Sequence, residues 1–165
     1  MKKWVKTVAL IALVAGGTWL VLMLRPGEEK IIQKRLEELA RTASFRSGES
    51  PLVALGAVQT LRGFFTTDVS VRGRLGSLGE RTVDGLDELT ELIAGTRQGL
   101  AGADFQFTAF RVDLGGGRES AIVLAALQYR LGADRNADVC DLRFALRKID
   151  GRWRIAKVET VESLN

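Results

Sequence analysis

Residues 137–161 read ADVCDLRFALRKIDGRWRIAKVETV, and this stretch decides the fold. Apolar side chains recur at every second position on both sides of a turn: Leu142, Phe144 and Leu146 before it, and Trp153 and Ile155 after it. A period of two is typical of a strand with one buried face. Asp150-Gly151, between the two runs, is a tight hairpin signal. The sequence therefore predicts two long antiparallel strands, over residues 137–149 and 152–161.

Two more strand-like runs precede this hairpin, over Phe105 to Asp113 and Glu119 to Leu131. Gly115-Gly116-Gly117 separates them, and a polar, glycine-led turn over residues 132–136 leads into the next strand. Short turns between consecutive strands favour antiparallel pairing. We therefore expect a four-stranded antiparallel meander that ends the chain.

Helical signals dominate the residues before the meander. Glu28 to about Ser44 carries apolar residues at helical spacing, which favours an amphipathic helix packed on a core over one lying on a membrane surface. Ser50-Pro51 is a strong helix start, and that helix is predicted to continue to about Phe64. Asp84 is predicted to cap a third helix.

Between the second and third helices, Asp68 to Arg72 alternates and predicts a short strand. Gly73, Gly76 and Gly79 after it predict a mobile loop. Helices first and an antiparallel meander last define an α+β domain. We expect about three helices packed on a curved, mostly antiparallel sheet.

The chain begins with a segment of another kind. Thr7 to Leu24 contains no charged side chain, and its 18 residues would span about 27 Å as a helix, close to the roughly 30 Å apolar core of a bilayer. Lys2, Lys3 and Lys6 precede it, which by the positive-inside rule keeps the N-terminus in the cytoplasm. We predict a single-pass anchor over residues 1–27 and a domain over 28–165 outside the cytoplasm.

The alternative for this segment is a cleaved secretory signal, but its apolar run is longer than is typical of one, and no A-x-A-like site follows. The net charge of +4 equals the basic residues of 1–27, so the domain is neutral and nucleic-acid binding is not expected. The chain has no histidine, which removes Ser-His-Asp and Cys-His chemistry and most zinc sites. The single cysteine, Cys140, allows no internal disulfide and excludes a lipoprotein signal.

Three short motifs in this order resemble the nuclear transport factor 2-like superfamily, which includes the polyketide cyclase (SnoaL-like) and ketosteroid isomerase groups. They are Leu61-Arg-Gly-Phe-Phe65 leading into Thr67-Asp-Val-Ser-Val71, then Val83-Asp-Gly-Leu-Asp-Glu-Leu89, and finally Lys148-Ile-Asp-Gly-Arg-Trp-Arg-Ile-Ala156. The resemblance covers about residues 28–162. It implies a cone-shaped fold with a pocket between sheet and helices, and frequent dimers, but no single activity.

The resemblance also implies candidate site residues, because enzymes of this fold use an acid in the cone as a base, often beside a tyrosine or a second acid. Asp68, Tyr129 and Asp141 are weak candidates for these catalytic roles. For each a simpler role is open: Asp68 in a turn, Tyr129 in the core or an interface, Asp141 in an ion pair with Arg143 or a neighbour. Neither a metal nor a cofactor is expected.

Apolar residues on the long strands would line the cone: Phe105, Phe107, Phe144 and Trp153. Basic residues on the last two strands indicate a solvated outer face, with an anion site or a docking face as alternatives: Arg143, Arg147, Lys148, Arg152 and Arg154. Two functions follow as hypotheses. One is a non-catalytic interaction or scaffold module in the inner membrane, facing the periplasm as a homodimer or in an envelope complex; the other is a binder, isomerase or cyclase of a small apolar molecule.

Overall fold

The computed structural model describes residues 27–74, 80–132 and 136–161. The predicted anchor over residues 7–24 lies outside these ranges. Within them, no helix is both long enough and apolar enough to cross a bilayer.

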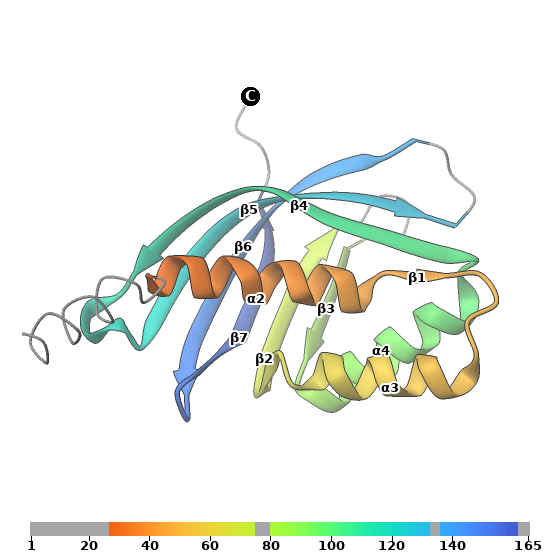
Figure 1. The fold of residues 1–165 in the computed structure, drawn as a ribbon, viewed down its shortest axis with the longest axis horizontal. Helices are drawn as coiled ribbons and strands as arrows, with labels where there is room; N and C mark the ends of the chain where they lie inside the picture. Colours follow the sequence, from red (N-terminus) through yellow and green to blue (C-terminus); the bar gives the residue numbers. More distant parts are fainter. Residues whose placement is uncertain (1–26, 75–79, 133–135, 162–165) are drawn as a thin grey trace, which may run out of the picture.

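The described residues form three α-helices and a seven-stranded sheet (Figure 1). The helices are α2 (Glu28–Ala43), α3 (Pro51–Arg62) and α4 (Leu86–Gly99). The strands are β1 (Phe45–Arg46), β2 (Phe65–Arg74), β3 (Glu80–Asp84), β4 (Gly102–Leu114), β5 (Ser120–Leu131), β6 (Asp138–Ile149) and β7 (Arg152–Val161). A short 3₁₀ turn, η2 (Gly116–Arg118), closes the β4–β5 hairpin. The predicted α+β class and the four long strands are confirmed.

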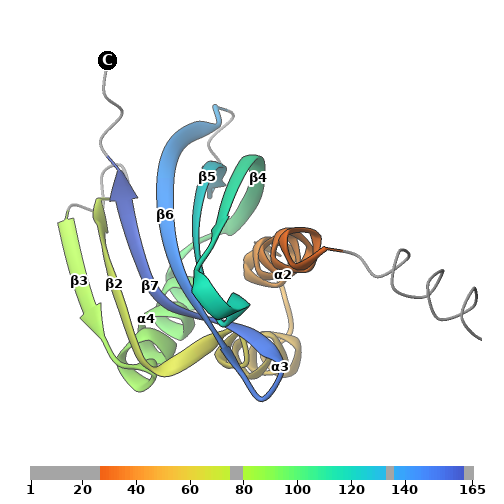
Figure 2. The ribbon, with the colours of Figure 1, turned by 90° about the vertical axis from the view of Figure 1, so that its left-hand side faces the viewer.

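The strand order is β1-β4-β5-β6-β7-β2-β3, and every neighbouring pair is antiparallel except β2 with β7, which is parallel. The chain thus places its last strand inside the sheet, between β6 and β2. Figure 2 shows the sheet curving around the helices, with α2 against one half and α3 and α4 together at one end.

One continuous core fills the space between the sheet and α2. Alternate residues of β5 and β6 point into it, and they meet Ile32 and Leu36 of α2, which are fully buried. Burying side chains of this size contributes roughly 1.5–3 kcal/mol each to the free energy of unfolding. The amphipathic helix predicted from Glu28 is therefore confirmed, with its apolar face on the core.

Helix α3 begins where predicted, but its solvent-facing side carries apolar residues. The Ser50 side chain caps it by accepting a hydrogen bond from the Val53 backbone nitrogen (3.4 Å). Val58 and Leu61 are buried, whereas Leu52, Val53 and Leu55 are 82%, 57% and 59% exposed. We call these three residues the α3 apolar face.

Two sequence predictions near β2 are wrong. Gly73, predicted to lie in a mobile loop, lies within β2, whereas Gly76 and Gly79 fall outside the described residues. Residues 80–84, for which no strand was predicted, form β3. A glycine is needed in β2 because a Cβ on Gly73 would lie 2.8 Å from Cγ2 of Thr160 on β7. The predicted short strand from Asp68 to Arg72 is therefore part of a ten-residue strand.

Asp84 does not cap α4. The N-cap is Gly85, with a φ of 97°, and the Asp84 carboxylate instead accepts a hydrogen bond from Ser70 Oγ at 2.7 Å. This bond ties β3 to β2 next to the start of α4. A positive φ suits glycine because it has no Cβ to clash.

Candidate functional site

The predicted aromatic residues share one face of the sheet but not one site. Phe107 and Phe144 contact each other edge to face, with ring centroids 5.6 Å apart, and Phe110 lies 5.7 Å from Phe107. Phe144 is buried, whereas Phe105 and Phe107 are half-buried. These rings pack against the core that α2 covers.

Trp153 lies towards the other end of the sheet, beside the β6–β7 turn. Its indole nitrogen donates a hydrogen bond to Glu28 Oε2 at 2.7 Å, and Lys148 Nζ donates to Glu28 Oε1 at 2.6 Å. Both bonds stabilise the charged carboxylate and so lower the pKa of Glu28. Trp153 therefore fastens the first turn of α2 to the last hairpin.

Asp68 lies on an exposed part of β2, where the pairing with β7 is irregular. Both carboxylate oxygens accept hydrogen bonds from Nη2 of Arg147, at 2.5 and 2.7 Å. The hydrogen bonds from Arg147, and to a lesser extent one from Thr66, lower the pKa of Asp68 to about 2. A general base in an apolar cone needs the opposite shift, because burial raises the pKa of a carboxyl group.

Tyr129 is buried on the inner face, opposite Phe105 on β4 and Asp138 on β6. Burial, and then the charge of Asp138, raise the pKa of its hydroxyl, so it stays protonated at neutral pH. Cys140 is half-buried on the same face, and burial raises the pKa of its thiol, which disfavours the reactive thiolate.

Asp141 lies on the outer face, paired across the sheet with Ala126 and Val161. Among the described residues it makes no ion pair, and Arg143 instead lies 3.9 Å from Glu159, so that predicted pair is wrong. The structure therefore does not bring Asp68, Tyr129 and Asp141 together: they lie on β2, the inner face of β5 and the outer face of β6.

The basic residues predicted to form one outer face do not all lie on the same side of the sheet. Arg143 and Arg147 are exposed and pair with acids, whereas Lys148 turns inward to Glu28. The described residues contain no cluster of three or more potential metal ligands.

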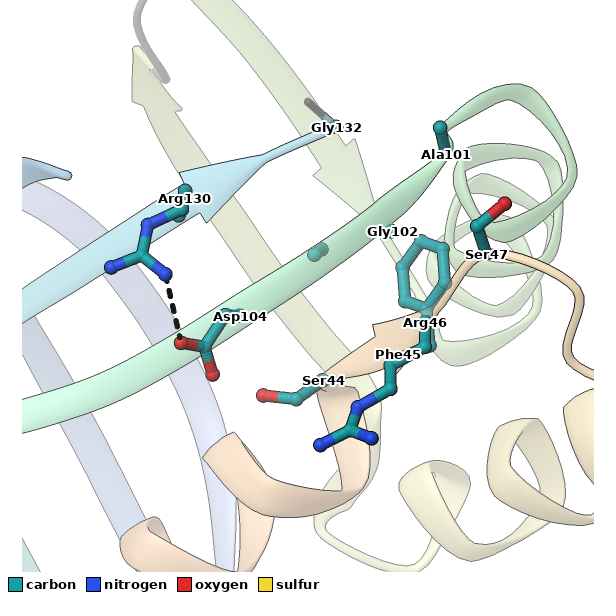
Figure 3. A pocket seen from close by; sticks show the side chains of 10 residues that line it. Ser44, Phe45, Arg46, Ser47, Ala101, Gly102, Asp104, Arg130 and Gly132 are labelled. Carbon is teal, nitrogen blue, oxygen red and sulfur yellow. Dashed lines mark ion pairs between the residues drawn. The ribbon is translucent and has the colours of Figure 1, made fainter. Parts of the chain in front are cut away.

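A groove of about 510 Å³ lies beside β1, and its lining residues are drawn in Figure 3. One wall is the segment from Ser44 to Ser47, and the other is the start of β4 with the end of β5, where Arg130 lies 4.0 Å from Asp104. Arg97 of α4 holds the first wall in place, because its Nη2 donates to the carbonyl oxygens of Thr42 and Ser44 at 3.1 and 3.2 Å. Most residues that line this groove are small: Ser44, Ser47, Ala101, Gly102, Ala103 and Gly132.

A second groove, of about 390 Å³, lies between α2 and the start of β7, and we call it the α2–β7 groove. It is lined by Ile31, Lys34, Arg35, Glu38, Arg152 and Trp153. Sequence reasoning missed it as a site, because the two walls are more than a hundred residues apart in the chain. Only the basic run around Arg152 indicated an anion site as an alternative.

Comparison with solved structures shows a nuclear transport factor 2-like, cystatin-like fold. A protein of unknown function with a cystatin-like fold from Nostoc punctiforme is 17% identical, with a TM-score of 0.61, over 84% of this chain and 96% of that one. A nuclear transport factor 2-like protein from Novosphingobium aromaticivorans is 19% identical, with a TM-score of 0.60, over 90% of each chain. A candidate scytalone dehydratase from the same organism is 15% identical, with a TM-score of 0.61, over 89% of each.

At these identities the likeness establishes the fold and not the activity. No family model matches the sequence. No curated protein matches it either.

Proposed function

We propose that this protein is a non-catalytic interaction module, anchored in the inner membrane by residues 7–24 and facing the periplasm, where it forms a homodimer or joins an envelope complex. The α3 apolar face carries the proposal. Pro51 to Leu61 contains no charged residue, and its Leu52, Val53 and Leu55 side chains are mostly exposed. Clustered apolar side chains on an exposed surface are typical of protein–protein contacts.

The anchor supports the same function. The described domain begins with α2 at Glu28, directly after Arg25-Pro26-Gly27, so an anchor over residues 7–24 would hold it close to the bilayer. Tethering confines a scaffold domain to two dimensions and raises its effective concentration for partners in the same membrane. A metabolic enzyme with a soluble substrate gains little from this.

The state of Asp68 also supports a non-catalytic role. Its ion pair with Arg147 keeps Asp68 charged and on the exposed surface of the sheet. The residue that the family resemblance suggests as a catalytic base therefore makes a surface contact instead. Replacing Asp68 with Asn should therefore leave the phenotype of the cell unchanged.

The test is cross-linking of the full chain in native membranes, with co-purification in mild detergent. The double variant Leu52→Lys/Leu55→Lys should lose the cross-linked species while remaining folded, because both side chains are exposed. Val139→Lys is the matched control: Val139 is 65% exposed but lies on β6, and this variant should cross-link like the wild type. Recovery of monomer alone from the wild type, with no co-purifying protein, contradicts the proposal.

A second candidate is a binder or isomerase of a small apolar molecule, favoured by the half-buried Phe105 and Phe107 on β4, of which Phe105 lies opposite Tyr129 in the sheet. The candidate scytalone dehydratase among the similar structures is compatible with it. Native mass spectrometry of the purified chain distinguishes the two: a bound small molecule that disappears in Phe107→Ala favours the second candidate. A ligand-free spectrum together with an unchanged phenotype for Asp68→Asn removes it.

A further inference from the structure

The α2–β7 groove carries more positive charge than its surroundings balance. Of its four ionisable lining residues, Lys34, Arg35 and Arg152 are basic and Glu38 is acidic. Glu38 Oε2 lies 3.6 Å from Arg35 Nη1, whereas Lys34 and Arg152 have no ion-pair partner among the described residues. A groove with unmatched cations favours an anionic ligand.

The neighbouring strand residue adds to this charge. Arg154 follows Trp153 on β7, and its Nε is buried without a hydrogen-bond partner among the described residues. Burial, together with repulsion from Arg152 and Arg154, lowers the pKa of Arg35. Arg152 and Arg154 are therefore close enough to Arg35 to repel its charge, and a bound anion would relieve that repulsion.

Hydrogen bonds and a ring contact hold one side chain on each wall of the groove, Arg35 on α2 and Trp153 on β7. Arg35 donates from Nη2 to the carbonyl oxygen of Gly63 at 2.9 Å, and its guanidinium lies 3.9 Å from the centroid of the Phe64 ring. On the other wall, the bond from Trp153 to Glu28 fixes the indole. Because Arg35 and Trp153 are already held, they lose less entropy on binding than free side chains would.

The lining is also partly apolar. Ile31, which lines the groove from α2, is 41% exposed. A small hydrated ion would leave this surface uncovered, whereas an anion that carries an aliphatic group would cover it.

We propose that the α2–β7 groove binds an amphiphilic oxyanion, with the oxyanion at Lys34, Arg35 and Arg152 and the aliphatic part along Ile31. Forked guanidinium groups suit phosphate and carboxylate oxygens, because two parallel N–H donors can meet two oxygens. This chemistry is shared by an anionic lipid headgroup and by a free phosphorylated or carboxylated amphiphile. The lipid source alone rests on the proposed anchor: Ile31 lies one helical turn from the start of α2, so an anchored domain would hold the groove close to the bilayer.

The test is isothermal titration of the full chain, in a neutral detergent, with hexyl phosphate below its micelle concentration. Saturable binding is expected, with no binding of hexanol. Lys34→Gln/Arg152→Gln should weaken the binding at least about tenfold, because it removes two charged donors. Arg41→Gln/Arg111→Gln removes the same charge from exposed positions elsewhere and should change the affinity less than twofold.

Glu38→Gln is a control that distinguishes a specific loss of binding from misfolding. Removing the acid of the groove should strengthen the binding of hexyl phosphate several-fold, a gain that misfolding cannot produce. No saturable binding by the wild type, equal losses in the two double variants, or weaker binding by Glu38→Gln would each overturn the proposal.

Nanodiscs separate the two sources of ligand. If a lipid headgroup occupies the groove, the chain in anionic nanodiscs should bind hexyl phosphate less well than in neutral nanodiscs, and this difference should vanish in Lys34→Gln/Arg152→Gln. Equal affinity in both nanodiscs supports a free amphiphile. Because the detergent titration requires neither anchor nor partner, its failure is distinct from loss of the cross-linked species at the α3 apolar face.

Discussion

Glu28 joins two distant parts of the chain at the scale of single residues. It accepts hydrogen bonds from Lys148 and Trp153, which lie 120 and 125 residues further on. Its side chain is 22% exposed, so water screens these contacts only in part. One carboxylate thereby fastens the first turn of the domain to its last hairpin.

The lowered pKa of Glu28 predicts a dependence of stability on pH. A carboxyl group whose pKa is lower in the folded state stabilises the fold above its unfolded value, about 4.3, and this stabilisation is lost as the pH falls through the folded value. Glu28→Gln should lower the free energy of unfolding by about 1–2 kcal/mol at pH 7, and the difference from wild type should shrink below about pH 4. Urea unfolding from pH 7 to pH 3 measures this.

Glu29→Gln is the control for that experiment, because Glu29 is exposed one position away in the same helical turn. It should lower the free energy of unfolding less than Glu28→Gln does, because it removes only the favourable interaction of a first-turn charge with the helix dipole. A Glu28→Gln curve parallel to the wild-type curve over the whole range would contradict the assigned role.

Gly73 gives a second prediction at this scale. Gly73→Ala should lower the free energy of unfolding by about 1–3 kcal/mol, because the new Cβ would lie 2.8 Å from Cγ2 of Thr160. Thr160→Ser removes that methyl group and keeps the hydroxyl, so it should reduce the cost of the alanine. A double-mutant cycle by chemical unfolding measures the coupling, and strictly additive effects would show that the contact is not responsible.

At the scale of elements, the spacing of apolar residues and local cap signals were sufficient to predict the long strands and the first two helices from the sequence. Leu142, Phe144 and Leu146 alternate because one face of β6 is buried, and Ser50-Pro51 carries a local cap signal. β3 was not predicted because its five residues follow glycines and carry no strand pattern of their own. They form a strand because they pair with β2. The same limit applied to the site: Asp68 and Arg147 are 79 residues apart, and no local pattern records their pairing.

Two glycines of helix α4, one at its N-cap and one in its interior, give a further prediction. Gly85→Ala should destabilise the protein by about 1–2 kcal/mol, because Gly85 has a φ of 97° at the N-cap. Gly95→Ala should stabilise it by about 0.5–1 kcal/mol, since Gly95 lies inside the helix and a Cβ added there would meet no neighbouring atom within 4 Å. Thermal unfolding should therefore shift the midpoint in opposite directions for the two variants, and shifts of the same sign would contradict this account.

At the scale of the whole molecule, the proposed anchor and the described domain are separable. Deletion of residues 1–27 should release the domain from the membrane fraction, whereas the full chain should resist extraction with alkaline carbonate. Equal release of both forms, or a mature chain that starts downstream of Leu24, would contradict the anchor. Membrane fractionation with N-terminal sequencing makes the measurement.

The position of β7 has a consequence for biosynthesis. Its ten residues leave the ribosome after all the other strands, yet β6 and β2 have no other means of meeting in the sheet. Until β7 has left the ribosome, β6 and β2 therefore each keep one unpaired edge. A premature stop codon that removes only this last strand should leave an insoluble or rapidly degraded product.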